Sequence, residues 1–238
     1  MSQKRISEID VLRTLALALM ILYHFIYDLD EWTSLPIDVD TFFWFWVGKI
    51  SALLFIFLSG VSSGLSKRPV KNGIKVLLWG LVITLVTGIA LPEEYVRFGI
   101  LHFLGTMMLI YPLLKRLPDF VLLFSAVLAI GLGFLFSSQV VHTVGFLPLG
   151  LTYPGFKTMD YYPLFPYCGV TLLGILFYRH RLAKPNIDMT HSIPSPSHKG
   201  SLLSSPIFQT ISRHSLGIYL VHQPLLLLII LSLNKLLS

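Results

Sequence analysis

The sequence is poor in charge and in cysteine for a chain of 238 residues. Charged residues make up 13% of it, whereas a soluble domain is about one quarter charged. The single cysteine, Cys168, excludes an internal disulfide and a thiol cluster for zinc or iron–sulfur. A glycine-rich phosphate loop is also missing. The composition therefore favours lipid as the solvent, and we expect no metal.

Apolar residues are abundant and come in long runs. Hydrophobic residues are 54% of the chain, and the mean hydropathy is +0.74. A helix of about 17–25 apolar residues can cross a bilayer. Such runs lie at about 9–29, 42–65, 73–91, 97–115, 118–137, 161–178 and 207–234. The sequence predicts an all-α, polytopic transmembrane bundle of about seven helices, folded as a single domain over residues 1–238.

The basic residues predict the orientation of this bundle. The loops that alternate between its two sides carry twelve Lys and Arg on one side and three on the other. Cytoplasmic loops hold the excess of Lys and Arg in membrane proteins, so we expect the N-terminus in the cytoplasm. The net charge of +6 is spread over short loops beside the membrane. This distribution argues against nucleic acid as a partner.

Two loops and one span have distinctive compositions. The external loop 138–160 is long and rich in Gly and Pro, and we expect a re-entrant or interfacial cap there. The cytoplasmic loop 185–206 holds four prolines and six serines, which is typical of a flexible linker. Gly60 and Gly64 in the second span predict close packing against another helix.

Ionisable side chains within the spans are candidate functional groups, because a charge at bilayer depth is costly. At a rise of about 1.5 Å per residue, four of them share a layer in the outer third of the hydrocarbon core. These four are His24, Lys49, His102 and His222. Asp28, one turn beyond His24, and Asp160, at the mouth of the sixth span, are expected beside this layer.

A second polar layer is predicted near the cytoplasm. Its cations are Arg13, Lys67, Arg68 and Arg213. Arg13 and His24 are eleven residues apart, so they point to the same side of the first helix, about 16 Å apart along its axis. With Asp10 and Asp28 they form one polar stripe that joins the two layers. Such an arrangement suits reactants that arrive from opposite sides of the membrane.

Each candidate also has a purely structural interpretation. Asp10 and Arg13 could be an interfacial ion pair, and Lys49 could extend outward to the aqueous surface. The histidines His102 and His222 could form hydrogen bonds between helices. The pair His24 and Asp28 is the stronger functional signal, because a carboxylate that orients an imidazole sets up a base.

Several segments resemble a known family. They are residues 5–16 (RISEIDVLRTLA), 20–29 (MILYHFIYDL), 97–105 (RFGILHFLG), 160–166 (DYYPLFP) and 213–224 (RHSLGIYLVHQP). In this order they resemble bacterial membrane proteins related to heparan-α-glucosaminide N-acetyltransferase. Thr14 stands where that family usually has glycine. The loop after Asp28 has no histidine, whereas the lysosomal enzyme has a catalytic histidine there.

The resemblance implies a transmembrane acyltransferase in a bacterial cytoplasmic membrane. The inner cations, Arg13 foremost, would bind the phosphates of acetyl-CoA or another acyl-CoA. An acceptor amine or hydroxyl, on an amino sugar or envelope glycan, would enter from outside. Its candidate binding residues are Lys49, Asp160 and Gln223.

The resemblance also bears on the catalytic residues. The candidates are His24, Asp28, His102 and His222. The family's catalytic asparagine falls about where His24 stands, so His24 is expected to be the base or the acyl carrier, with Asp28 as its orienting partner. Direct transfer and an acyl-histidine intermediate both remain open.

Two rival functions fit the same residues. Buried His, Lys and Asp are equally natural in a small multipass transporter or channel, and a non-catalytic membrane subunit is the third interpretation. Binding of acyl-CoA separates the enzyme from both. Partners are expected to be small molecules and membrane lipid, and a homodimer is compatible with the sequence.

Overall fold

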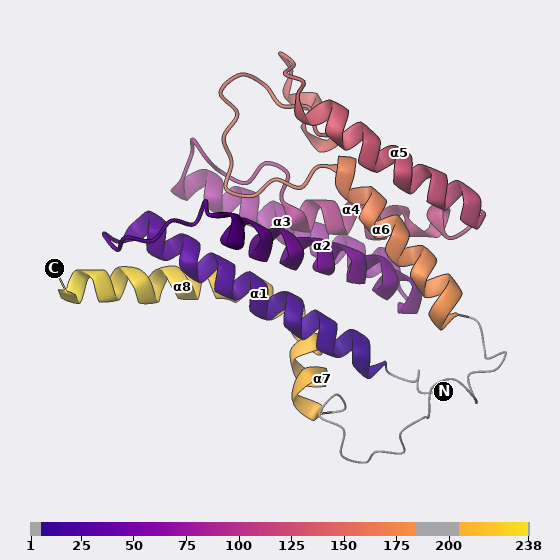
Figure 1. Ribbon diagram of the computed structural model, residues 1–238, viewed down its shortest axis with the longest axis horizontal. Helices are drawn as coiled ribbons and strands as arrows, with labels where there is room; N and C mark the ends of the chain where they lie inside the picture. Colours follow the sequence, from indigo (N-terminus) through magenta and orange to yellow (C-terminus); the bar gives the residue numbers. More distant parts are fainter. Residues whose placement is uncertain (1–5, 184–204, 238) are drawn as a thin grey trace. The chain divides into compact units, whose positions relative to one another are not determined.

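The structure is a computed structural model that describes residues 6–183 and 205–237. Its regular elements in these ranges are helices (Figure 1). They are α1 (Ser7–Trp32), α2 (Phe42–Leu65), α3 (Pro69–Ala90), α4 (Ile100–Leu114), α5 (Asp119–Ser137), the 3-10 helix η1 (Val144–Leu149), α6 (Leu164–Phe177), the π-helix η2 (Tyr178–Leu182), α7 (Pro206–Arg213) and α8 (Ser215–Leu237). The predicted linker 185–206 lies outside the described residues except for its last two positions.

The described chain divides into two compact units. The first contains α1, the part of α2 up to Phe55, α7 and α8. The second begins at Ile56 within α2 and contains α3 to α6 with η1 and η2.

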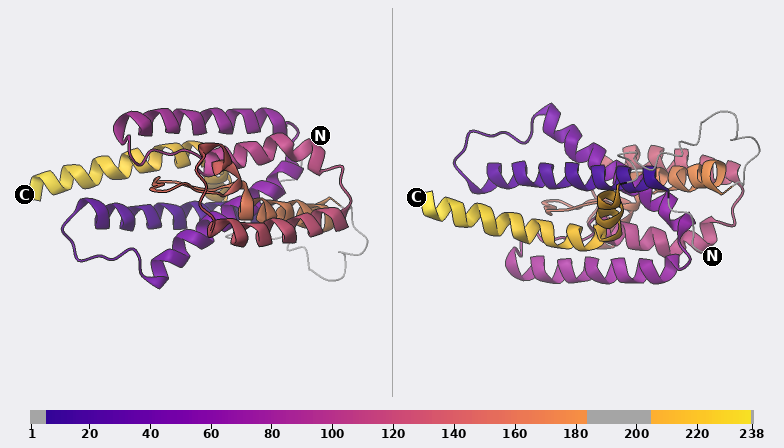
Figure 2. Two further views of the ribbon diagram at one scale, coloured as in Figure 1. Left: turned by 90° about the horizontal axis from the view of Figure 1, so that it is seen from above. Right: turned by 90° about the horizontal axis from the view of Figure 1, so that it is seen from below.

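In the first unit α1 runs parallel to the C-terminal helices (Figures 1 and 2). The Arg13 guanidinium donates a hydrogen bond to the Ser212 hydroxyl at 2.7 Å. Further along, the Asn234 amide donates to the Trp32 carbonyl at 3.1 Å. The residue numbers therefore increase in the same direction along α1 and along α7 and α8, as they do in parallel helices. The polar stripe of α1 faces α7 and α8.

The first part of α2 runs antiparallel to α1. The Ser51 hydroxyl donates to the Ala16 carbonyl at 2.9 Å. Earlier in α2, the Tyr23 ring fills the space beside Gly48, so closely that a Cβ atom there would lie 2.9 Å from the ring. The close approach of the two helices at this point requires glycine.

The predicted last span, 207–234, is two helices. Ser205 caps α7 by accepting the Ile207 N–H, and Pro206 stands at the first helical position, where its missing N–H costs nothing. α7 ends at Arg213, because the backbone of His214 leaves the helical conformation. α8 then continues through Pro224.

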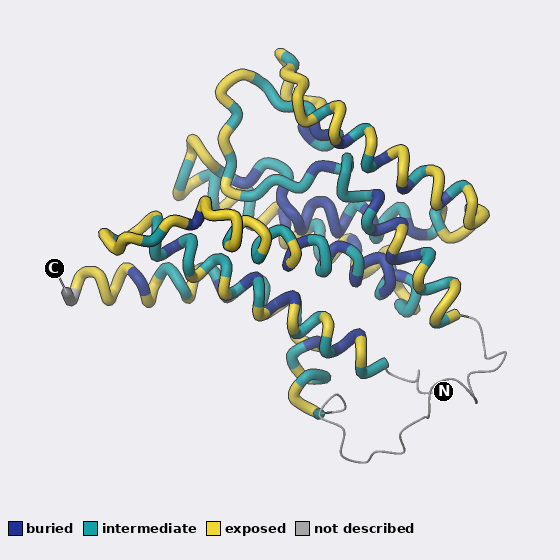
Figure 3. Tube along the Cα trace, in the orientation of Figure 1, coloured by how far each residue is buried: buried dark blue, intermediate teal, exposed yellow. Residues whose placement is uncertain are grey.

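The second unit is built from two antiparallel pairs, α3 with α4 and α5 with α6. In the first pair, Gly73 lies against Met108 while Thr84 contacts His102. α4 is enclosed within this unit, and every residue from Ile100 to Gly105 is buried (Figure 3).

The end of α2 runs parallel to α6. Gly60 lies against Thr171, and Gly64 lies against Tyr178 further along both helices. A Cβ atom on Gly60 would be 2.2 Å from the Thr171 carbonyl oxygen, which is far inside van der Waals contact. The close packing predicted from these two glycines is therefore present.

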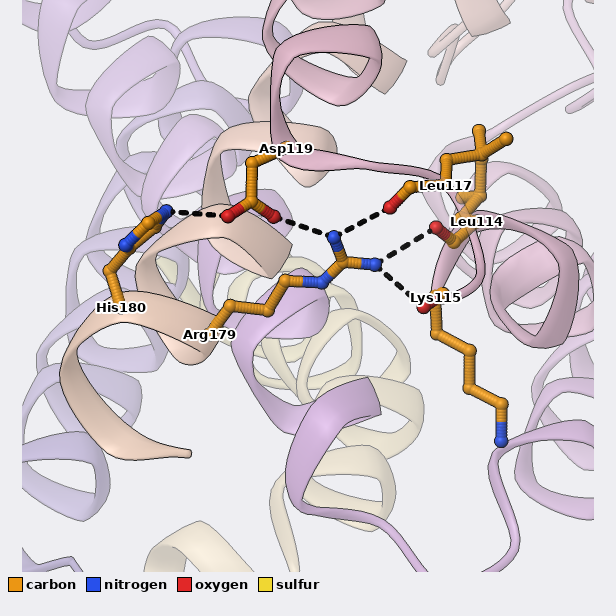
Figure 4. Close-up of polar contacts among 6 residues, drawn as sticks. All are labelled: Leu114, Lys115, Leu117, Asp119, Arg179 and His180. Atoms are coloured by element: carbon orange, nitrogen blue, oxygen red, sulfur yellow. Dashed lines mark hydrogen bonds and ion pairs between the residues drawn. The ribbon is translucent and has the colours of Figure 1, made fainter. Parts of the chain in front are cut away.

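Arg179 of η2 joins the C-terminal end of α4 to the start of α5 (Figure 4). Its guanidinium donates to the carbonyls of Leu114, Lys115 and Leu117 and to the carboxylate of Asp119, which also contacts His180. The carbonyls at a helix C-terminus have no partner in the helix, so this one side chain supplies several of the missing donors.

The loop 138–160 folds as an ordered cap over the start of α4. The end of this loop and the residues that follow it pair with residues 94–98. The Met159 N–H donates to the Glu94 carbonyl at 2.9 Å, and the Tyr162 N–H, just after the loop, donates to the Phe98 carbonyl at 3.0 Å. The Tyr161 hydroxyl donates to the Leu147 carbonyl in η1 at 2.8 Å. The loop therefore positions Asp160 against the N-terminus of α4.

Five helices are long and apolar enough to cross a membrane: α1, α2, α3, α5 and α8. The sequence predicts seven. α4 is apolar but has 15 residues and α6 has 14, which is about 22 Å of helix against a hydrocarbon core of about 30 Å.

Candidate active site

His24 of α1 and His222 of α8 lie side by side in the first unit. Their ring centroids are 4.9 Å apart and the rings meet edge to face. His222 is buried, and His24 is half-buried. The two histidines for which the sequence predicts the same depth are thus in contact.

Each histidine is oriented by a carbonyl of its own helix. Nδ1 of His24 lies 2.9 Å from the Met20 carbonyl oxygen, and Nδ1 of His222 lies 2.5 Å from the Tyr219 carbonyl oxygen. A carbonyl only accepts, so Nδ1 carries the proton in both rings. The basic lone pair of each neutral imidazole is therefore on Nε2.

Asp28 pairs with Gln223, not with His24. The Gln223 amide donates to Oδ1 of Asp28 at 2.7 Å, and Asp28 is only 1% exposed. His24 already uses the Met20 carbonyl for its Nδ1–H. The orienting role that the sequence suggests for Asp28 thus has a different partner, the amide on α8.

Three buried acceptor atoms at this place have no hydrogen-bond partner within the described residues. They are Oδ2 of Asp28, Nε2 of His222 and Oε1 of Gln223. A buried polar atom normally has a partner. The cluster of His24, Asp28, His222 and Gln223 is therefore the strongest candidate active site in the first unit.

Two further predicted site residues lie on α1 and α2. Arg13, about 16 Å along α1 from His24, is held by the buried Ser212 hydroxyl. Lys49 is half-buried, and its Nζ lies 5.8 Å from the centre of the Phe45 ring. Arg213, at the end of α7, is exposed.

His102 belongs to the second unit, where both ring nitrogens have partners. The Gly99 N–H donates to Nδ1 at 3.3 Å, and Nε2 lies 3.3 Å from the Thr84 hydroxyl. That hydroxyl donates its own proton to the Val96 carbonyl, so Nε2 of His102 is the donor. The contacts fix the start of α4, and the catalytic role of His102 stays a prediction.

Asp160 caps the N-terminus of α4. Its Oδ2 accepts the Ile100 N–H at 2.8 Å. Burial raises the pKa of this carboxyl to about 6, and the Ile100 hydrogen bond opposes that shift. A Cβ atom on Gly99 would lie 2.1 Å from Oδ2, so glycine is needed next to the carboxylate.

The remaining predicted cations, Lys67 and Arg68, are exposed in the turn between α2 and α3 of the second unit. The described part of the chain has no group of three or more His, Cys, Asp or Glu side chains that could hold a metal ion.

Sequence reasoning missed the groups that orient the candidates. Ser212 carries no signal, since a serine in a helix has many possible roles. The Met20 and Tyr219 carbonyls could have been anticipated, because a helical histidine can reach the carbonyl three or four residues earlier. The hydrogen bond between Asp28 and Gln223 could not be predicted without knowing that α1 packs against α8.

Together the fold and the cluster define a multipass helical membrane protein with a histidine pair beside a buried carboxylate. The chain matches the family described as heparan-alpha-glucosaminide N-acetyltransferase, catalytic, over residues 5–224, and it belongs to this family. The resemblance drawn from the motifs is thereby confirmed, and membership indicates a membrane acetyltransferase. A search of curated proteins and a search of solved structures gave no match.

Proposed function

We propose that this protein transfers an acetyl or other acyl group from cytoplasmic acyl-CoA to an amine or hydroxyl on the outer side of a bacterial cytoplasmic membrane. The acceptor is an amino sugar or glycan. The proposal is carried by the His24–His222 pair, 4.9 Å apart, in a chain of an acetyltransferase family.

The histidine pair is suited to acyl transfer. Each ring presents a lone pair on Nε2 while its Nδ1–H is held by a carbonyl, and a base must be oriented before it can accept a proton. In direct transfer one imidazole takes the proton of the acceptor. In a ping-pong reaction one of them, such as His24, first carries the acyl group.

The donor is proposed to enter from the cytoplasmic end of α1. The Arg13 guanidinium would bind the phosphates with Arg213, because a guanidinium fork matches phosphate oxygens. Lys67 and Arg68, in the second unit, stay predicted cofactor-binding residues. A distance of about 16 Å along α1 separates Arg13 from His24. An extended pantetheine arm can cover that distance.

In the first unit, the acceptor side is proposed to include Lys49 and Gln223 besides His24 and His222, and Asp160 of the second unit stays a predicted acceptor-binding residue. Gln223 is the best supported of the three, because its amide contacts Asp28 directly. His102 stays a further catalytic candidate.

Binding of acetyl-CoA to the purified full-length protein tests the proposal. We expect saturable binding, together with acetyl transfer to an added amino sugar. Neither a transporter nor a non-catalytic subunit requires acyl-CoA. Absence of both binding and transfer would overturn the proposed function in favour of those two rivals.

A further inference from the structure

Four basic side chains at one end of the second unit take no part in the proposed cofactor site. They are Lys71 and Lys75 of α3 and Lys115 and Arg116 just after α4. The four residues are exposed, and none of their side chains forms a hydrogen bond or an ion pair with another described residue. We call these four residues the basic end patch.

The packing of α3 against α4 places the four cations at the same end of this antiparallel pair. Gly73 lies so close to α4 that a Cβ atom on it would be 2.8 Å from the Cβ atom of Met108. Lys71 precedes this contact on α3, and Lys115 follows it beyond the end of α4. Like charges at one end of a helix pair repel each other, and a bound anion relieves that repulsion.

The carboxylates of the second unit do not neutralise the basic end patch. Residues 41–92, which include α2 and α3, contain no Asp or Glu. Three of the four carboxylates in this unit lie at the other end of the α3–α4 pair: Glu93, Glu94 and Asp160. The fourth, Asp119, is bonded to Arg179 at 2.7 Å and to His180 at 3.0 Å. The patch is therefore left without an acidic partner in its own unit.

The two lysines of α3 lie on the side of this helix that faces away from α4. Gly73 and Gly80, on the opposite side, are buried against α4. At about 100° of rotation per residue, Leu78 and Val82 share the side of the two lysines, and these apolar side chains are 57% and 44% exposed. This side of α3 thus begins with two ammonium groups and continues as an exposed apolar surface.

This combination favours a lipid over a soluble phosphate as the ligand. A free phosphate or a nucleotide needs only the cations, whereas a phospholipid has a charged head and acyl chains that match both parts of the surface. Clusters of Lys and Arg beside a transmembrane helix attract anionic headgroups. A zwitterionic headgroup has no net charge to match the patch.

We propose that the basic end patch is a binding site for an anionic phospholipid of the adjacent leaflet, which is the cytoplasmic leaflet in the predicted orientation. The lipid phosphate contacts the ammonium groups of Lys71 and Lys75, with Lys115 and Arg116 beside them. The acyl chains lie along the exposed apolar side of α3. The site is separate from the histidine pair of the first unit and does not depend on the proposed acyl transfer.

Thermal unfolding of the purified full-length protein in a nonionic detergent tests the site. The two probes are dioleoyl phosphatidylglycerol and dioleoyl phosphatidylcholine, which have the same acyl chains and differ in net charge. We expect phosphatidylglycerol to raise the unfolding midpoint and to remain bound in native mass spectrometry. Phosphatidylcholine should do neither.

Lys71→Gln/Lys75→Gln removes two charges and keeps side chains that favour helix. A basic residue near a membrane surface contributes about a factor of five to the binding of anionic lipid. The double variant should therefore bind phosphatidylglycerol roughly tenfold more weakly or worse. Lys157→Gln is the matched control, because it removes the charge of an exposed lysine in the loop at the other end of the unit. Its phosphatidylglycerol binding should stay normal.

Equal stabilisation by the two lipids would overturn the inference, and so would undiminished phosphatidylglycerol binding by the double variant. Two soluble competitors complete the test: glycerol 3-phosphate, which has the headgroup phosphate without acyl chains, and acetyl-CoA. We expect neither to displace the bound phosphatidylglycerol. Displacement by glycerol 3-phosphate would make the patch a site for soluble phosphate, and displacement by acetyl-CoA would assign it to the cofactor. Either result would refute the lipid site.

Discussion

At the scale of single residues, each of the two histidines is oriented by its own helix, whereas the contact between them depends on the packing of α1 against α8. The Nδ1 protons of His24 and His222 go to carbonyls three or four residues earlier in the same helix. Each imidazole thus keeps its tautomer independently of Asp28. The Asp28 carboxylate therefore orients neither imidazole ring and contacts the Gln223 amide instead.

His24→Ala separates a chemical from a structural role for this residue. A histidine that only connects helices contributes about 0.6 kcal/mol, and turnover would remain nearly intact. As base or acyl carrier, its loss should reduce acyl transfer by about 10²–10⁴-fold with acyl-CoA binding retained. Transfer and binding assays on the folded variant decide this, with His142→Ala in the loop 138–160 as control.

Arg13→Ala should weaken acyl-CoA binding by about 1–3 kcal/mol, the range for hydrogen bonds that involve a charged group. The variant also loses the bond to Ser212. Ser212→Ala is therefore the control, since it removes that bond and keeps the guanidinium. Titration with acyl-CoA should show weak binding in the first variant and near-normal binding in the second. Equal weakening in both would assign Arg13 a packing role.

At this scale the sequence predicts at what depth along its helix a side chain lies, but not which side chain of another helix it contacts. Helical rise alone placed His24 and His222 at one depth, because depth depends on residue count. Whether two side chains at one depth touch depends on which helices pack and how they are rotated. That is why the contact of Asp28 with Gln223, 195 residues away, could not be foreseen from the spacing of four residues between His24 and Asp28.

At the scale of elements, two side chains hold the start of α4. The Asp160 carboxylate accepts from the Ile100 N–H, and His102 accepts from the Gly99 N–H. A negative group near a helix N-terminus is stabilising. These contacts account for the motif RFGILH. Gly99 leaves space for the Asp160 carboxylate, and His102 accepts a hydrogen bond from the Gly99 N–H.

Gly99→Ala should destabilise the protein, because its Cβ would lie 2.1 Å from Oδ2 of Asp160 and displace the cap. Loss of a helix cap costs about 0.5–2 kcal/mol. Gly131→Ala is the matched control, since a Cβ atom there would meet no other atom within 4 Å and alanine favours helix. Thermal unfolding in detergent should show a lower midpoint for Gly99→Ala than for Gly131→Ala. The reverse order would contradict the cap.

Asp160→Asn should alter the pH dependence of stability. The pKa of Asp160 is raised to about 6 in the folded protein from 3.8, so the folded state binds the proton more tightly. Its contribution is fully present below about pH 4 and is lost as the pH rises through 6. Relative to Asp160→Asn, the unmutated protein should lose up to about 3 kcal/mol between pH 4 and 7. A difference that stays constant with pH would refute this.

Element boundaries show where sequence reasoning ends. The predicted span 207–234 breaks at His214, where the backbone leaves the helical conformation. Its first part is polar, with Gln209, Thr210, Ser212 and Arg213, and the helix that is long and apolar enough to cross a membrane begins at Ser215. The spans at 97–115 and 161–178 are shorter than predicted for a different reason. Residues 97–99 and 161–163 precede α4 and α6 as non-helical chain, in which Phe98 pairs with Tyr161 and Tyr162, and Tyr178 belongs to η2.

At the scale of the whole molecule, helix directions limit the number of crossings. Successive crossings alternate in direction, so the parallel α1 and α8 require an odd total. In the second unit α6 is parallel to α2 and antiparallel to α5, so α5 opposes α2. If only α1, α2, α3, α5 and α8 crossed the membrane, α5 would be parallel to α2. Seven crossings, with α4 and α6 as short ones, would give these directions, and the number of crossings stays a prediction.

Cysteine labelling tests this topology in a Cys168→Ala background. With seven crossings and a cytoplasmic N-terminus, an impermeant thiol reagent added outside should label Thr143→Cys and should not reach Lys71→Cys or Arg116→Cys. With five crossings, Arg116→Cys would be labelled and Thr143→Cys protected. External labelling of Lys71→Cys would reverse the orientation that the basic loops predict.

The parallel pairing of α1 with α7 and α8 also sets an order of events during synthesis. Arg13 and Ser212 are 199 residues apart, and Asp28 and Gln223 are 195 apart. At about 5–20 residues per second, roughly 10–40 s pass between the emergence of the first helix and that of its partners. Throughout this time the most polar span of the protein is already made, with its ionisable side chains uncompensated. The candidate active site can therefore form only after α8 has been synthesised, long after α1, and a chain that stops before α8 cannot contain it.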